Sequence, residues 1–125
     1  LELGDRVRIV GRVPFADLPS YYHAADVLLY APLLAGFGLP PLEAMAYGTP
    51  VVSSNASCLP EILGDAAEYF DPKDITSMAG VIERVITDSE LRAEMIARGH
   101  KQVAKYSWKK MARETHAIYM KVLKD

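Results

Sequence analysis

The residues best suited to chemistry form a glycine-rich turn, Gly36-Phe37-Gly38, which runs into a proline-started helix. A glycine has no Cβ, so its backbone can take a positive φ and approach a ligand closely. Pro40 and Pro41 suit the first turn of a helix, where a missing N–H leaves no bond unmade. Free N–H groups at a helix start attract an anion such as a phosphate, which makes the turn a candidate anion site. Glu43 is expected in the same first turn, where it would either bind a ligand or only stabilise the helix dipole.

The elements around this turn form a strand–loop–helix–strand unit. Residues 26–30 are a continuous apolar run typical of a buried parallel strand, and residues 51–54 start the next one. Gly48 suits the end of the helix between them, and Pro50 prevents its continuation. The glycine turn therefore lies at the carboxyl end of a strand, where open α/β sheets bind ligands. Residues 53–55 end the next strand and would either line the cleft or serve as caps.

The rest of the chain alternates further strands and helices. Strands are predicted at residues 7–10 and 67–70. Helices are predicted from a cap at Asp17 to about residue 25, as one turn at 61–63, and over 75–87, 90–105 and 107–122, with Ser89 and Ser107 as caps of the last two. Four strands with alternating helices predict the α/β class, with a Rossmann-like parallel sheet that is half of a doubly wound one.

The composition is that of one soluble globular domain. The chain has 125 residues, of which 50% are apolar and 24% charged, and its net charge of −2 predicts no nucleic-acid partner. No apolar run approaches the roughly 20 residues of a membrane span, and no signal peptide is visible. Cys58 is alone, so no disulfide forms within the chain, which predicts a cytoplasmic location.

Several short motifs of the chain occur together in one known family. They are Gly11-Arg12-Val13-Pro14, Leu18-Pro19-Ser20-Tyr21-Tyr22, Ala24-Ala25-Asp26-Val27, Gly36-Phe37-Gly38-Leu39-Pro40-Pro41-Leu42-Glu43-Ala44-Met45-Ala46, Gly48-Thr49-Pro50-Val51-Val52, Leu59-Pro60-Glu61-Ile62 and Phe70-Asp71-Pro72. Together they resemble the retaining, nucleotide-sugar-dependent glycosyltransferases of the group 1 family. The resemblance implies a type B (GT-B) fold, with two Rossmann-like domains facing across a cleft. Residues 1–125 would be a partial C-terminal, donor-binding domain, and the N-terminal acceptor domain would be absent.

The resemblance also implies a reaction and a set of site residues. The parent enzyme would move a hexose such as mannose or glucose from a nucleoside diphosphate sugar to a glycan or lipid acceptor. The missing domain would bind that acceptor and could hold the enzyme at the periphery of a membrane. The implied donor-binding residues are Val13 at the base edge, the turn residues Gly36, Phe37, Gly38, Leu39 and Pro40, and Glu43 at the ribose hydroxyls. A carboxylate with two acceptor oxygens suits a vicinal diol.

The charge of the leaving diphosphate has to be stabilised by a metal ion or by fixed dipoles and cations. The helix start can supply dipoles, and the sequence has no Asp-x-Asp pattern, so no metal or other cofactor is expected to be required. The family's Arg and Lys that face the diphosphate would lie upstream of Leu1, and Arg6, Arg8 and Arg12 do not match them. The isolated chain is therefore expected to be inactive.

Ala35 departs from the family pattern, in which a glutamate directly precedes the glycine turn. That glutamate usually helps to hold the donor sugar or the reacting centre, and a methyl group can do neither. A subfamily that uses another group, an inactive relative and an engineered change all remain open. The catalytic residue is accordingly unassigned.

Two other classes of function remain open. One is a non-catalytic Rossmann-like module that binds a nucleotide or mediates assembly. The other is an epimerase or a phosphorylase of the same fold, although a phosphorylase needs a pyridoxal phosphate lysine and no lysine lies in the glycine turn.

The last helix carries an apolar face with i, i+3, i+4, i+7 spacing: Trp108, Met111, Ala112, Thr115, Ile118, Tyr119 and Val122. In the resembled family this helix packs on the N-terminal domain. Without that domain, the chain is expected to self-associate through this face or to leave the helix poorly ordered.

Overall fold

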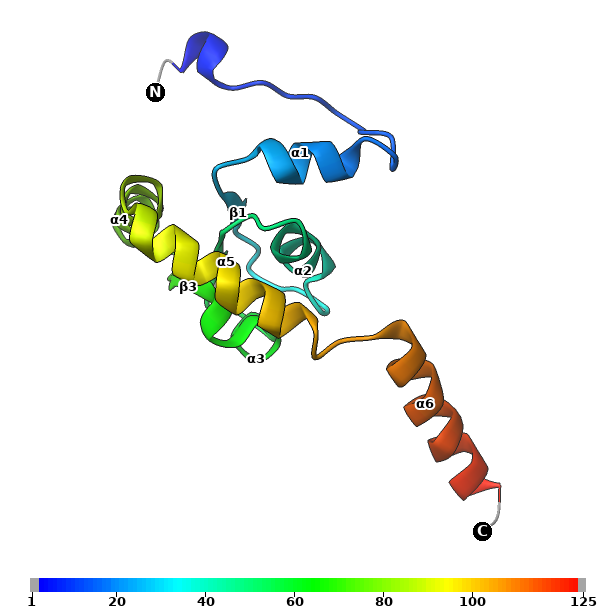
Figure 1. Cartoon of the computed structure of the whole chain (residues 1–125). Helices are drawn as coiled ribbons and strands as arrows, with labels where there is room; N and C mark the ends of the chain where they lie inside the picture. Colours follow the sequence, from blue (N-terminus) through cyan, green and yellow to red (C-terminus); the bar gives the residue numbers. More distant parts are fainter. Residues whose placement is uncertain (1–2, 124–125) are drawn as a thin grey trace.

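The computed structural model describes residues 3–123, and its centre is a three-stranded parallel sheet in the order β1-β2-β3 (Figure 1). The strands are β1 (Leu28–Tyr30), β2 (Val51–Ser54) and β3 (Ala67–Phe70). Leu28 lies opposite Val51, which in turn lies opposite Ala67. The predicted parallel α/β architecture is thus confirmed for these strands.

The fourth predicted strand, at residues 7–10, is not formed. In Figure 1 this segment runs along the outer side of α1 (Leu18–Ala24), away from the sheet. Val7 and Ile9 are 56% and 92% exposed. An alternating pattern makes a strand only where a neighbouring strand accepts its backbone hydrogen bonds, and no strand of the described chain lies beside this segment.

The α-helices follow the predicted bounds closely, whereas the two 3-10 turns were not predicted. They are the 3-10 turn η1 (Gly4–Arg6), α1, α2 (Leu39–Ala46), α3 (Leu59–Leu63), the 3-10 turn η2 (Gly64–Ala66), α4 (Ile75–Thr87), α5 (Ser89–Val103) and α6 (Trp108–Val122). Ser107 caps α6 as predicted, by accepting from the Lys110 N–H at 3.3 Å. The other predicted caps were wrong. Asp88, not Ser89, caps α5, and the Asp17 side chain accepts no capping bond.

The core lies on both faces of the sheet, because successive strand residues point to opposite sides. Val51 packs with Leu42 and Met45 of α2 on one face. Val52 packs on the other face with Phe70, and with side chains of α4 and α5. The sheet is therefore covered on both faces, as a doubly wound sheet requires.

Gly99 allows α5 to pack closely on α2. A Cβ added to Gly99 would lie 3.2 Å from both Cβ and Cγ of Met45, a side chain that is only 2% exposed. The Met45 Cβ cannot move without its backbone, so a methyl group at Gly99 would push the two helices apart.

We therefore expect Gly99→Ala to destabilise the domain by about 1–2 kcal/mol, since overpacking exceeds the gain in helix propensity. Gly80→Ala on α4 is the matched control, because its Cβ would meet open space. It should stabilise by about 0.5–1 kcal/mol. Urea unfolding of the two variants measures both changes in the free energy of unfolding. An equal gain in stability in both would contradict the close packing.

Helix α6 stands apart from the body of the domain (Figure 1), and none of its described residues is buried. Its predicted apolar face is formed, but Trp108, Ile118, Tyr119 and Val122 are 63–73% exposed. The helix is regular and capped by Ser107. Self-association through this face, or poor order of the helix in the isolated chain, stays a prediction. Within the described chain, no helix has the length and apolar character that a membrane span needs.

Candidate functional site

The glycine turn lies where predicted, after β1 and directly before α2. The two glycines are not equivalent. Gly38 has a φ of 103°, and a Cβ there would lie 2.9 Å from Leu59 Cδ2. Gly36 has no positive φ, and its Cβ position is open. Only Gly38 is thus required by the backbone, which corrects the expectation that both glycines serve the same purpose.

At this helix start, the backbone N–H groups without a carbonyl acceptor lie on the turn and on the first residue of α2. Within residues 3–123, Gly36, Phe37, Gly38 and Leu39 donate no hydrogen bond to a backbone carbonyl. Leu39 is the first helical residue, and Pro40 and Pro41 after it have no N–H to offer. The backbone donors that this helix start could offer to an anion therefore belong to the four residues before Pro40.

The loop after β2 holds the turn by its carbonyl groups. Ser57 Oγ donates to the Ala35 carbonyl at 2.9 Å, and the single Cys58 thiol hydrogen is shared between the same oxygen, at 3.3 Å, and the Phe37 carbonyl, at 3.6 Å. Ser57 has a φ of 58°, which a non-glycine residue rarely adopts. These bonds fix the turn while leaving its N–H groups free. Sequence reasoning missed these bonds, because nothing local predicts a bond across more than 20 positions.

Ser53 and Ser54 do not line the site, which corrects one of the two roles left open for them. Both are fully buried, and Ser54 Oγ donates to the Pro32 carbonyl at 2.7 Å. Asn55, directly after the strand, is exposed. Ser54 therefore ties the segment after β1 to β2.

Glu43 lies one turn deeper in α2 than predicted. The helix begins at Leu39 and has no acidic residue in its first turn, so Glu43 does not serve as an N-terminal charge for the helix dipole. Its Oε2 instead accepts a hydrogen bond of 3.0 Å from the Tyr22 hydroxyl of α1. Burial, reinforced by that bond and by the Glu43 charge, raises the pKa of Tyr22 to about 12. The hydroxyl consequently keeps its proton at neutral pH and remains a donor.

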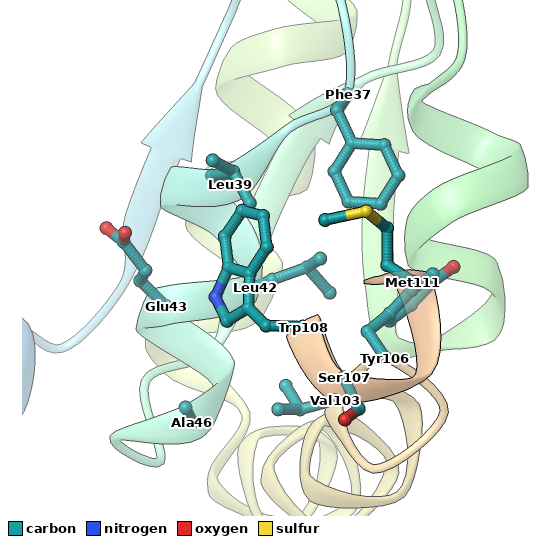
Figure 2. Close-up of a pocket in the computed structure, with 10 residues that line it drawn as sticks. All are labelled: Phe37, Leu39, Leu42, Glu43, Ala46, Val103, Tyr106, Ser107, Trp108 and Met111. Carbon is teal, nitrogen blue, oxygen red and sulfur yellow. The ribbon is translucent and has the colours of Figure 1, made fainter. Parts of the chain in front are cut away.

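Two hollows meet at Glu43. The larger, of about 310 Å³, is lined by Phe37, Leu39, Leu42, Glu43, Ala46, Val103, Tyr106, Ser107, Trp108 and Met111. Figure 2 shows Trp108 and Met111 of α6 facing the side chains of the turn and α2, whereas the Glu43 carboxylate points away from this apolar cluster.

The smaller hollow, of about 100 Å³, lies between α1 and α2. It is lined by Phe15, Leu18, Pro19, Tyr22, Glu43 and Tyr47. Val13 lines neither hollow, whereas Phe15, two residues further on, lines this one. The structure therefore gathers the turn and Glu43 around α2 but does not bring Val13 to them.

Cations and metal ligands are sparse around the turn. No Lys or Arg lines either hollow. Within residues 3–123, no three His, Cys, Asp or Glu side chains come together as a metal site would need. The groups that the described chain offers to a ligand here are backbone N–H donors, one carboxylate and aromatic walls.

The parallel sheet, its flanking helices and the turn at the end of β1 define the C-terminal domain of a GT-B glycosyltransferase. Sucrose-phosphate synthase from Thermosynechococcus elongatus matches 98% of the chain with a TM-score of 0.87 and 30% identity, over 31% of its own length. The C-terminal domain of a group 1 family glycosyl transferase from Francisella tularensis matches 78% of the chain with a TM-score of 0.68 and 33% identity, over 51% of that structure. The chain belongs to the group 1 glycosyl transferases, whose sequence model matches residues 1–102.

Curated relatives in this family include mannosyltransferases. O-antigen chain mannosyltransferase B of Escherichia coli is 41% identical over 90% of this chain. Phosphatidyl-myo-inositol mannosyltransferase of Mycolicibacterium smegmatis is 34% identical over 94% of it. The chain spans 30% and 31% of these two proteins, so most of each relative lies outside the matched part.

Proposed function

We propose that this chain is the donor-binding part of a retaining glycosyltransferase that moves a hexose such as mannose from a nucleoside diphosphate sugar to a glycan or lipid acceptor. The observation that carries the proposal is that, in the described chain, the turn with its unpaired N–H groups leads directly into α2, and Phe37, Leu39 and Glu43 border the same hollow. The family and its mannosyltransferase members support the reaction class. The acceptor would be bound by a domain outside residues 1–125, so the chain alone would not transfer sugar.

The chemistry of the turn fits a leaving diphosphate. Transfer breaks the bond between the anomeric carbon and the β-phosphate oxygen, and negative charge develops on that oxygen. N–H groups that are already fixed stabilise such charge without reorganising. The N–H groups of Gly36 and Gly38 are fixed in this way, because they share peptide planes with the Ala35 and Phe37 carbonyls that Ser57 and Cys58 hold. We propose that this donor set works without a required metal ion.

Glu43 would accept hydrogen bonds from the two ribose hydroxyls of the nucleotide. In the full-length parent, we expect Glu43→Gln to weaken nucleoside diphosphate binding by about 1–3 kcal/mol, since an amide loses one charged acceptor oxygen. Calorimetry with uridine and guanosine diphosphates measures the change. Glu61→Gln on the exposed side of α3 is the matched control. Equal affinity of the Glu43 variant and the wild type would remove Glu43 from the binding site.

Ala35 favours one alternative, a non-catalytic member that binds the donor without turning it over. The methyl group of Ala35 cannot hold the donor sugar, and the Ala35 carbonyl is already bonded to Ser57 and Cys58. A full-length parent that binds the nucleotide sugar but transfers nothing to glycan or lipid acceptors would support this alternative. Transfer would show that another group supplies the missing carboxylate's role.

A further inference from the structure

Tyr22 is held from three sides at the point where α1 meets α2. Its hydroxyl donates to Glu43 Oε2 at 3.0 Å, and its ring stacks on Tyr47 with centroids 6.1 Å apart and an interplanar angle of 13°. Its carbonyl accepts a 2.6 Å bond from Thr49 Oγ1, which is itself buried. Tyr22 is only 9% exposed, so its hydroxyl is a fixed point rather than a mobile surface group.

Thr49 and Tyr47 are fixed in turn by the end of α2. The Gly48 N–H donates to the Met45 carbonyl at 3.1 Å and the Thr49 N–H to the Ala44 carbonyl at 2.9 Å, with Gly48 at a φ of 77°. This is the Schellman pattern that closes a helix rigidly. Helix α2 therefore carries Glu43, and the turn that ends this helix holds Tyr22, whose hydroxyl donates to Glu43.

We propose that Tyr22 is a positioning residue that orients the Glu43 carboxylate, and thereby sets the preference of the site for a vicinal diol. The inference rests on the proposed function and deepens it. A free glutamate side chain has several rotamers and loses that freedom when it binds a ligand. The Tyr22 bond fixes one oxygen, Oε2, before the ligand arrives.

A fixed carboxylate discriminates between ligands in a way that a mobile one does not. Each carboxylate oxygen has more than one acceptor position, so Oε2 can keep the Tyr22 bond and still accept a second one. Oε1 and Oε2 then face the ligand as two acceptors at a set spacing. That spacing suits the two adjacent hydroxyls of a ribose, whereas a 2′-deoxyribose leaves one of the two acceptors unused.

The Tyr22 proton makes this arrangement independent of pH over the neutral range. Burial is the largest cause of its raised pKa, and the Glu43 bond adds to it. The hydroxyl therefore keeps its proton, and with it the hydrogen bond to Glu43 Oε2, throughout the neutral pH range. Glu43 is the ionisable side chain that borders the smaller hollow together with the two tyrosines.

The test compares the full-length parent with its Tyr22→Phe variant. Phenylalanine keeps the buried ring and removes only the hydroxyl. Calorimetry on the wild type first determines whether uridine or guanosine diphosphate binds more tightly. The tighter nucleotide and its 2′-deoxy form are then the two probes for every variant. Tyr22→Phe should weaken binding of the ribose form about 3- to 10-fold and the deoxy form much less. The ratio of ribose to deoxyribose affinity should therefore fall. A general loss of structure would instead weaken both affinities alike.

Two further variants complete the experiment. Tyr21→Phe alters the exposed neighbouring tyrosine and should leave both affinities unchanged. Glu43→Asp keeps the charge but shortens the side chain by one methylene, which moves the carboxylate away from the Tyr22 hydroxyl. It should reduce the ribose preference even if Tyr22→Phe folds poorly.

The outcomes separate this inference from the proposed function. A wild type that binds neither nucleotide would overturn the proposed function itself. A wild type that binds with a ribose preference, keeps that preference in Tyr22→Phe and loses it in Glu43→Asp would overturn the positioning role alone.

Discussion

Gly38→Ala is expected to destabilise the domain by about 2–4 kcal/mol. A non-glycine residue forced to a φ of 103° costs about 1–3 kcal/mol. The new methyl group would also lie 2.9 Å from Cδ2 of Leu59, which is fully buried and cannot swing aside. Overpacking of this kind adds about 1–3 kcal/mol, part of which local relaxation relieves.

Gly36→Ala is the matched control for this effect. It lies two residues earlier in the same turn, without a positive φ and with open space at its Cβ position. Its free energy of unfolding should stay within about 0.5 kcal/mol of the wild type. Urea denaturation of both variants measures the difference. Similar stability of the two variants would mean that Gly38 does not hold the strained conformation described above.

Residues 1–125 alone are expected to self-associate through α6. Trp108, Ile118 and Tyr119 are 73%, 63% and 65% exposed on one face of this helix. Burying a large apolar side chain contributes about 1.5–3 kcal/mol, so covering three of them on each of two copies favours association strongly. Sedimentation over a range of concentrations should show a dimer or larger species for the wild type and a monomer for the Trp108→Ser, Ile118→Ser, Tyr119→Ser variant.

A second triple variant separates the apolar face from the helix as a whole. Lys110→Ser, Glu114→Ser and Lys121→Ser alter the polar side of α6, where Lys110 and Glu114 form an exposed ion pair at 4.0 Å. This variant should associate as the wild type does. A wild type that is monomeric at every concentration, with α6 amides protected from hydrogen exchange, would mean that the face packs on its own domain.

The sequence predicted the parts of the fold that local pattern determines. The apolar run before Tyr30 and the stop at Gly48 and Pro50 fix the β1–α2–β2 unit, because strand and helix signals there depend on neighbouring residues only. Residues 7–10 show the limit of such signals. Their alternation is typical of a strand, but a strand exists only beside a partner, and the partner is not a local property.

The candidate site also combines parts that the local sequence predicts with parts that depend on how the elements pack. The place of the glycine turn was predicted from residue types and spacing, whereas the binding role of Glu43 was implied by the family resemblance alone and stays a prediction. The Tyr22–Glu43 bond, which joins residues 21 positions apart, depends on how α1 packs against α2. The expected position of Glu43 depended on where α2 begins. Because the helix begins at Leu39, Glu43 lies beyond the first turn and does not act as a charge for the helix dipole. The exposure of Trp108 likewise depends on where α6 points, which periodicity does not specify.

The order of the strands in the sheet has a consequence for how the chain folds. Because β1, β2 and β3 lie side by side in the order of the sequence, each parallel pair closes over a single short crossover. Such pairings have a low contact order for a parallel sheet, and contact order governs folding rate. During synthesis, each strand can join the edge of the previous one soon after its crossover leaves the ribosome, with no need to wait for the end of the chain. Helix α6 follows β3 in the sequence, so the apolar face that it carries is synthesised after these three strands.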